Sequence, residues 1–161
     1  MTSSKPGPVF LDADVLAASL TRTLILVSST TRGAPFQPRW SPAVEKEADR
    51  HRRPGQTPLA ALRNTGYWEA EAMMVPDAPE AEINSLADTS PNDRHQLAAA
   101  GAAGINVVVT RNIRHFGSAD LASFGATAIH PDLFLAAVMT PTMRRETLSA
   151  IAAVRHRPPD T

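Results

Sequence analysis

Oxygen-bearing side chains recur in four separate segments of the sequence. They are Asp12 with Asp14, Glu45 with Glu47, Asp93, and Asn112. Carboxylates that gather without matching cations repel one another, and they stay together only where something positive neutralises them. Mg²⁺ or Mn²⁺ does so through oxygen ligands, and such an ion activates water and stabilises charge on a phosphate. Hydrolysis of a phosphodiester is therefore the chemistry that these residues suit, if the fold brings them together.

Each acidic residue also has a structural interpretation. Asp93 stands three residues after Ser90, so it could complete a capping box at a helix start. Glu45 and Glu47 could favour the positive end of a helix or face water. Asp12 is harder to explain in this way, because an acid at the end of a buried apolar strand is costly without a partner.

Arginines lie beside the acids in the sequence. Arg94, Arg111 and Arg114 could clamp a substrate phosphate through paired N–H groups, although each could equally form a structural salt bridge. Of the five histidines, His95 and His115 are possible substrate contacts. The histidine spacing does not match the H-x-x-x-H pattern of a metal site.

The order of the predicted elements indicates how the acids are positioned. Apolar runs predict strands at residues 9–11, 72–75, 105–110 and 126–129, and helical spacing predicts helices at 15–29, from Ser41, 58–65, 93–103, 131–139 and 142–154. We expect loops at 33–39 and 51–57, where proline and glycine occur. Alternating strands and helices predict a three-layer α/β/α domain with a central parallel sheet. Ligands bind such sheets beyond the carboxyl ends of the strands, where Asp12 and Asn112 lie.

Length and composition limit the possible classes. A chain of 161 residues fits one domain, and the absence of cysteine excludes disulfides, thiolate metal sites and a thiol nucleophile. Residues 1–8 are expected to be a flexible N-terminus without a secretory signal, and no apolar run approaches the roughly 20 residues that span a bilayer. We therefore expect no membrane association and a cytoplasmic location. The net charge of zero does not by itself indicate nucleic-acid binding.

Four motifs together resemble the PIN-domain family. Residues 9–16 look like its first strand and motif, with Asp12 in the place of the first catalytic aspartate. Residues 40–47 resemble the second motif, in which Glu47 matches better than Glu45. Residues 90–100 place Asp93 in the third acidic position, and residues 107–116 are similar to the fourth motif. The resemblance divides the chain into a PIN-like nuclease domain, 9–130, and a packed C-terminal helical extension, 131–161, with a mobile tail from about 155.

The resemblance implies an endoribonuclease that depends on Mg²⁺ or Mn²⁺, most often the VapC-type toxin of a type II toxin–antitoxin pair. Asp12, Glu47 and Asp93 would hold the metal, and Asn112 would be an outer ligand or would position water. Asp14 and Glu45 are further possible ligands. The implied partners are an RNA substrate and a cognate antitoxin protein. The helices within residues 131–154 offer an apolar surface for that antitoxin or for a homodimer, although this surface could instead pack only on the domain's own core.

Two departures from the family pattern bear on this interpretation. Asp14 stands where the family usually has asparagine, and Asn112 stands where it often has aspartate, so one change could compensate the other. Residues 50–64 also match poorly.

Two other functions fit part of the sequence. A haloacid-dehalogenase-like phosphatase would use Asp12 as nucleophile and Asp14 as general acid, but the lysine that this mechanism needs is missing after Thr110. A catalytically silent PIN-like binding module would have lost its metal.

Overall fold

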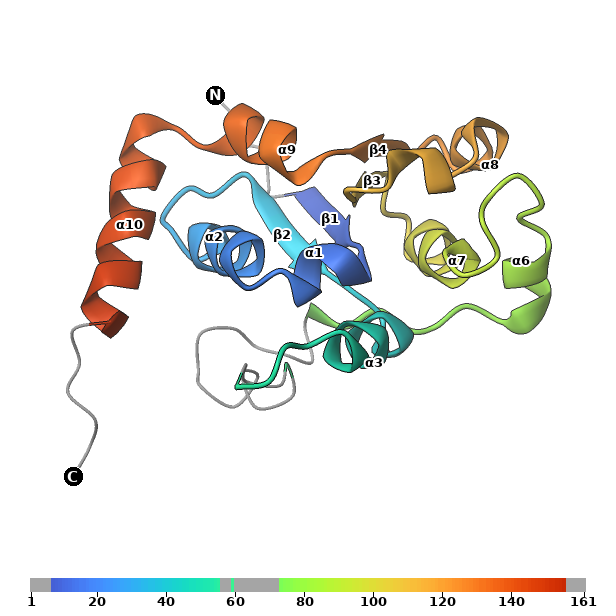
Figure 1. Ribbon diagram of the computed structural model, residues 1–161. Helices are drawn as coiled ribbons and strands as arrows, with labels where there is room; N and C mark the ends of the chain where they lie inside the picture. The colour runs from blue at the N-terminus through green and yellow to red at the C-terminus, as the bar shows by residue number, and fades with distance from the viewer. Residues whose placement is uncertain (1–6, 56–58, 60–72, 156–161) are drawn as a thin grey trace.

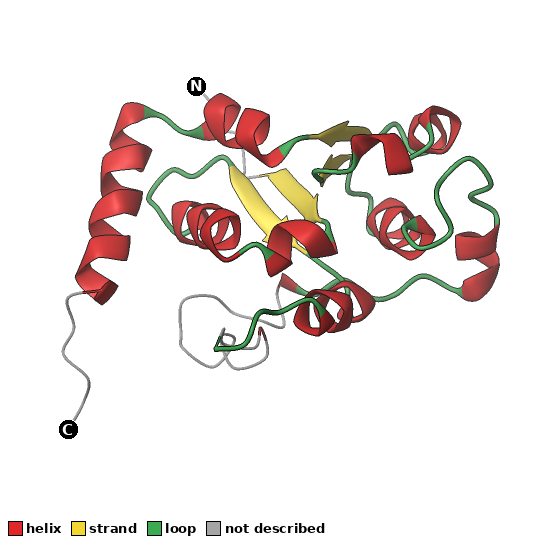
Figure 2. Cartoon of the chain, in the orientation of Figure 1, coloured by secondary structure: helices red, strands yellow, loops and turns green. Residues whose placement is uncertain are grey.

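The computed structural model describes residues 7–55, 59 and 73–155. Its centre is a four-stranded, fully parallel sheet in the order β2-β1-β3-β4, and helices cover the sheet to complete a three-layer α/β/α fold (Figures 1 and 2). The strands are β1 (Gly7–Leu11), β2 (Phe36–Arg39), β3 (Val107–Val109) and β4 (Thr127–Ile129). The helices are α1 (Ala13–Ala17), α2 (Ser19–Ser29), α3 (Pro42–Arg50), α6 (Glu80–Asn84), α7 (Arg94–Ala102), α8 (Ser118–Ser123), α9 (Pro131–Val138) and α10 (Pro141–Arg155), with a short 3-10 turn at Ile113–His115.

The two central strands carry the core. Phe10, Leu11, Val108 and Val109 are fully buried, as continuous apolar strands covered on both faces should be. The chain leaves β1 toward β2 on one side and later returns as β3 on the other side. The strand order therefore reverses between β1 and β3, and a crevice forms beyond the carboxyl ends of strands at such a point.

Several predicted elements are confirmed, with small shifts at their ends. Ser41 caps α3 by accepting the Val44 N–H at 3.4 Å, with Pro42 in the first turn. Gly104, which has a φ of 72°, follows α7 in the left-handed conformation that favours glycine. The first strand begins at Gly7, so residues 7 and 8 belong to the sheet and not to the expected flexible terminus.

The loop prediction for residues 33–39 is partly wrong, because Phe36–Arg39 form strand β2. Two prolines argued against a strand, but among the described residues β2 is an edge strand of the sheet, whose one ladder is with β1. An edge strand can contain Pro38 because one side of its backbone needs no ladder partner. Of the strand expected at 72–75, residue 72 lies outside the described residues, and residues 73–75 contain an isolated bridge between Trp40 and Met74.

The single helix predicted for 15–29 is two helices that break at Ala18, whose ψ of 103° is extended. Buried Arg22 explains how the break is tolerated, since its guanidinium donates to the Leu16 carbonyl at 3.1 Å. That carbonyl would otherwise lack a partner at the end of α1. Apolar periodicity continues through the break and therefore does not reveal it. The helix predicted for 58–65 lies outside the described residues except for Leu59, and α6 and α8 were not predicted.

The C-terminal helices return across the sheet. After β4 at one edge, α9 places the buried Phe134 ring against Phe36 of β2 at the opposite edge, with ring centroids 4.9 Å apart and an interplanar angle of 81°. α10 then packs against α2. Within the described residues, none of the helices combines the length and hydrophobicity needed to cross a membrane.

We expect Phe134→Ala to lower the free energy of unfolding by about 3–5 kcal/mol, because it removes a buried aromatic contact that fastens α9 to the sheet. Leu133→Ala is the matched control: its neighbouring side chain is exposed, so the change should stay within about 0.5 kcal/mol. Urea denaturation measures both. Equal effects of the two substitutions would contradict this packing of α9.

Candidate functional site

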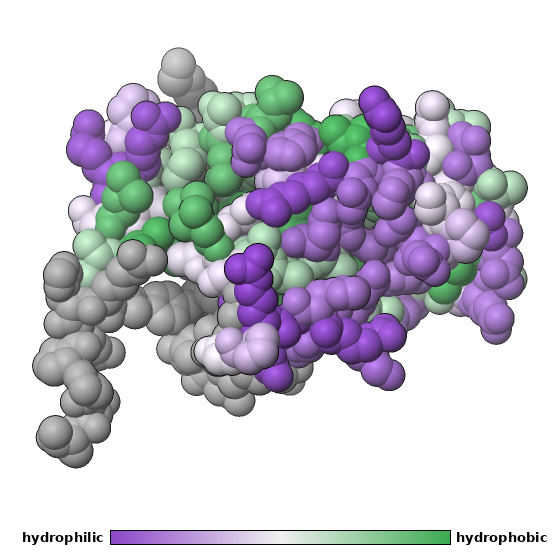
Figure 3. All heavy atoms as spheres, viewed as in Figure 1, coloured by the Kyte–Doolittle hydropathy of each residue, from purple (hydrophilic) through white to green (hydrophobic). Residues whose placement is uncertain are grey.

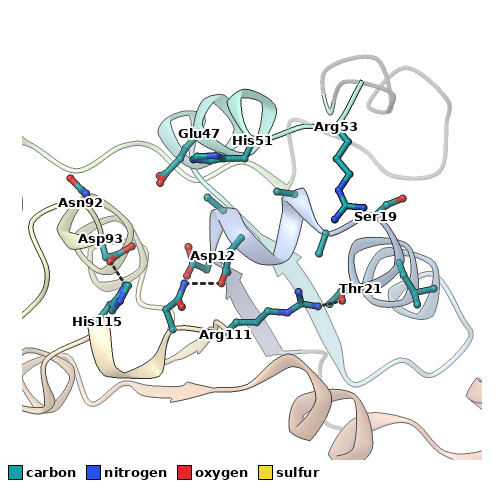
Figure 4. A pocket seen from close by; sticks show the side chains of 16 residues that line it. Asp12, Ser19, Thr21, Glu47, His51, Arg53, Asn92, Asp93, Arg111 and His115 are labelled. Carbon is teal, nitrogen blue, oxygen red and sulfur yellow. Dashed lines mark hydrogen bonds and ion pairs between the residues drawn. The ribbon is translucent and has the colours of Figure 1, made fainter. Parts of the chain in front are cut away.

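A pocket of about 820 Å³ lies beyond the carboxyl ends of β1 and β3. Four carboxylates line it: Asp12 after β1, Asp14 on α1, Glu47 on α3 and Asp93 before α7. The labelled members of this set face a common space (Figure 4). Segments that lie far apart in the sequence therefore meet at the edge of the sheet where they were expected.

Asp12 is the most deeply placed of the four, with 2% of its surface exposed. Its backbone N–H donates to the Val109 carbonyl at 3.0 Å, and its Oδ2 accepts the Thr110 hydroxyl at 2.6 Å. Thr110 is itself fully buried and also accepts the Asn112 N–H at 3.0 Å. The hydroxyl thus joins the ends of two neighbouring strands and fixes one oxygen of Asp12. Sequence reasoning did not assign Thr110 this part, although it directly follows the most apolar strand.

Asp14 pairs with Asn112 beside Asp12. The Asn112 amide donates to Asp14 Oδ2 at 3.0 Å, whereas Asp14 Oδ1 is buried without a hydrogen-bond partner. Burial, followed by the negative charge of Asp12, raises the pKa of Asp14 from 3.8 to about 7. Asp14 and Asn112 are therefore in direct contact, although they lie 98 positions apart in the chain.

The side chain of Asp93 does not cap α7, so the capping-box interpretation is wrong. Its Oδ2 lies 3.1 Å from His115 Nδ1, and its Oδ1 accepts the fully buried Gln96 amide at 3.3 Å. Burial, then repulsion from Asp12, raises the pKa of Asp93, and His115 opposes that shift. Asp93 is thus oriented toward the pocket by two side chains.

The structure separates Glu47 from Glu45. Glu47 lines the pocket, and its Oε2 lies 3.2 Å from His95 Nε2. Glu45 is buried on another side of α3, where it accepts the Trp40 indole N–H at 3.0 Å and lines a different cavity with Lys46. Glu45 therefore neither faces the site nor faces water. Both residues were predicted on one helix, and because residues two positions apart lie on different faces of an α-helix, only one of them can face the pocket.

The structure also separates the three predicted phosphate-binding arginines. Arg111 lines the pocket and donates to Thr21 Oγ1 at 2.5 Å. Arg94 instead donates to the Thr89 carbonyl at 3.0 Å, and neither Arg94 nor exposed Arg114 lines the pocket. Arg53 lines the pocket although no motif indicated it. The only sequence feature that could have indicated Arg53 is its position in a basic loop directly after the helix that carries Glu47.

Further pocket residues were not predicted as site residues. His51 follows Glu47 by one helical turn, a spacing that could have revealed it, and Asn92 immediately precedes Asp93. His115, expected as a possible substrate contact, lines the pocket while paired with Asp93. His95 is paired with Glu47 at the neighbouring cavity.

The donor set fits a hard divalent cation. All four pocket carboxylates offer oxygen ligands. Burial and repulsion from Asp12 make Asp14 and Asp93 harder to ionise, and a bound cation would favour their charged forms. Asp14 Oδ1 is also buried without a hydrogen-bond partner. No three histidine or acidic side chains of the described residues gather closely enough to form a complete ligand group. Mg²⁺ does not need such a cage, because it keeps several waters and binds through one or two carboxylates.

No family model, curated protein or solved structure matches this chain.

We expect Thr110→Val to lower the free energy of unfolding by about 1–3 kcal/mol, because it removes a donor from buried Asp12 and an acceptor from the Asn112 N–H. Thr110→Ser keeps the hydroxyl and should retain most of that stability. Urea denaturation compares the two variants. A valine variant as stable as the serine variant would contradict the bridging role of Thr110.

The raised pKa of Asp14 predicts a pH dependence of stability. The folded, metal-free protein binds this proton more tightly than the unfolded chain does, so wild-type stability should fall as pH rises from about 4 to 7. Asp14→Asn cannot ionise, and its stability relative to wild type should therefore rise across that window. Urea denaturation in EDTA at several pH values measures the difference, in which the contribution of Asp93 largely cancels. Parallel profiles would contradict the shift.

Proposed function

We propose that this protein is a metal-dependent endoribonuclease that hydrolyses phosphodiester bonds of RNA. The observation that carries the proposal is the meeting of Asp12, Glu47 and Asp93 at one pocket, together with Asp14 and Asn112. Each of the three acids comes from a different motif of the PIN-domain resemblance. Carboxylates from distant segments accumulate repulsion that a cation relieves, and arginines at the same pocket suit a phosphate.

The chain's own residues have distinct parts in this proposal. Asp12, Glu47 and Asp93 would hold Mg²⁺ or Mn²⁺, which when bound supplies activation of water and neutralisation of phosphate charge. Thr110 fixes Asp12, His115 and Gln96 orient Asp93, and His95 orients Glu47. Side chains held in this way need little rearrangement before reaction. Asn112 positions Asp14, which adds a carboxylate where the family usually has an amide.

The phosphatase alternative has one observation in its favour. With a pKa near 7, Asp14 could serve as a general acid. Asp12, however, would have to attack phosphorus while 98% buried and hydrogen-bonded to Thr110. The only lysine among the described residues, Lys46, lines a different cavity and does not balance the charge of these acids. The geometry therefore favours metal-dependent hydrolysis.

The biological role that we propose, the toxin of a type II toxin–antitoxin pair, rests on the resemblance alone. An antitoxin or a second copy would need an accessible surface. Leu133 on α9 and Leu148 on α10 are more than half exposed, and Figure 3 shows hydrophobic side chains gathered over these helices. This surface is compatible with either partner.

We expect purified protein to cleave a mixed RNA pool with Mn²⁺ or Mg²⁺ and to lose that activity in EDTA. Asp12→Asn and Asp93→Asn should each reduce cleavage about 100-fold or more, the usual scale for losing a positioned catalytic group. Glu82→Gln is the control, because Glu82 is exposed on α6 and does not line the pocket. Gel analysis of the products measures cleavage, and circular dichroism shows whether each variant folds.

Three outcomes would separate the functions. Full activity of folded Asp93→Asn would overturn the proposed role of that residue. Denaturation and refolding would remove any bound antitoxin. If the refolded protein cleaves no RNA with any metal but hydrolyses p-nitrophenyl phosphate, the phosphatase is favoured. Silence toward both substrates, with no heat of Mn²⁺ binding in titration calorimetry, would favour the non-catalytic binding module.

A further inference from the structure

The pocket has two ends of opposite charge. Its acidic end contains the four carboxylates, whereas Arg53 and Arg111 line its other end (Figure 4). The basic end lies beside the start of α2, where Arg111 reaches Thr21 and Arg53 extends toward Ser19. The arginines and the acids therefore occupy different parts of the same cavity.

Arg111 is oriented toward α2 by a hydrogen bond, although its positive charge still acts on Asp14, whose pKa it lowers slightly against the larger effect of burial. It follows Thr110 in the chain, yet its Nη2 donates to the Thr21 hydroxyl at 2.5 Å, on a buried residue of α2. A guanidinium has five N–H donors in a fixed fork, so this one bond leaves others to face the cavity. Arg111 itself is exposed, which makes it accessible to a ligand.

Small side chains connect the two ends. Ala17 and Ala18 line the pocket between Asp14 and Ser19 in the chain, at the break between α1 and α2. Leu20, 68% exposed, lines the same cavity and offers apolar surface near the basic end. A volume of about 820 Å³ exceeds what a single phosphate group fills, so the cavity can hold a longer part of a polynucleotide.

We propose that Arg111 and Arg53 bind a phosphate adjoining the one that is cleaved, so that the enzyme selects a polynucleotide strand over an isolated phosphodiester. This inference rests on the proposed ribonuclease function and deepens it. The carboxylates repel a phosphate unless a cation intervenes, whereas an arginine attracts one directly. A strand that lies along the pocket therefore places one phosphate at each end, and this arrangement fixes its direction.

The test uses an RNA oligonucleotide that contains one mapped cleavage site. In separate copies, a neutral methylphosphonate replaces the phosphate on the 5′ side or on the 3′ side of the cleaved linkage. We expect one of the two replacements to reduce kcat/KM of wild type about 10- to 100-fold, the scale for losing hydrogen bonds to a charged group. The other replacement should have a smaller effect.

Arg111→Ala should slow cleavage of the unmodified oligonucleotide and lose most of the sensitivity to that replacement, because both changes remove the same contact. Arg53→Ala should lose part of the sensitivity to the same methylphosphonate replacement. Arg32→Ala removes an exposed arginine that does not line the pocket, and it should keep the full sensitivity of wild type. Binding of the oligonucleotide in EDTA provides a second measurement, in which Arg111→Ala should make the salt dependence shallower by about 0.7 per lost phosphate contact.

Two results would overturn the inference while leaving the ribonuclease function intact: cleavage that is insensitive to both replacements, or Arg111→Ala that remains as sensitive as wild type. The second result would assign Arg111 to the cleaved phosphate or to structure alone. Absence of cleavage of the unmodified oligonucleotide with either metal would instead overturn the proposed function itself.

Discussion

The hydrogen bond between Thr110 and Asp12 connects the sheet to the site. It exists because β1 and β3 are neighbouring parallel strands, whose ends must lie side by side. A carboxylate in this position is almost fully enclosed, so its cost is tolerable only with a donor at hand. The buried hydroxyl supplies that donor and leaves the rest of the Asp12 carboxylate directed to the pocket. The other site residues are arranged around this fixed point.

The carboxyl groups of Asp14 and Asp93, which lie near Asp12, are harder to ionise than free carboxyl groups. Burial is the main cause that raises the pKa of Asp14 and of Asp93, and the negative charge of Asp12 raises both further. Polar partners offset part of the free energy of burying these carboxylates: an amide for Asp14, a histidine and an amide for Asp93, and a histidine for Glu47. Arg111 opposes part of the shift at Asp14 while its guanidinium is hydrogen-bonded to Thr21, and Arg53 lies near Ser19. Such an arrangement gathers the carboxylates at one pocket, which is the electrostatic basis of the metal site that we propose.

The site was more predictable than its surroundings. Acids that follow apolar strands of a parallel sheet must lie at its carboxyl edge, and this rule placed Asp12 and Asn112 without any side-chain information. It did not separate Glu47 from Glu45, because both lie on α3 and only the folded chain shows that Glu47 faces the pocket while Glu45 is buried against the Trp40 indole. Nor did it reveal that Arg94 bonds to a loop carbonyl, since Thr89 approaches it only in the folded chain.

The sequence by itself determined the alternation of strands and helices, the start of α3 at Ser41, the end of α7 before Gly104 and the strand ends that carry the acids, because local backbone preferences and apolar periodicity control these features. The tertiary structure alone decided that residues 36–39 form an edge strand, that α1 and α2 separate at Ala18, and that Arg53 and Arg111 share a cavity with the carboxylates. Strand β2 forms by pairing with β1, which lies more than twenty residues earlier in the chain, and Arg111 is oriented by Thr21, which lies 90 residues away. The helix break instead depends on a nearer contact, because the Arg22 guanidinium reaches back six residues to the Leu16 carbonyl. Contacts between distant residues form only when the whole chain has folded, so local sequence patterns do not contain them.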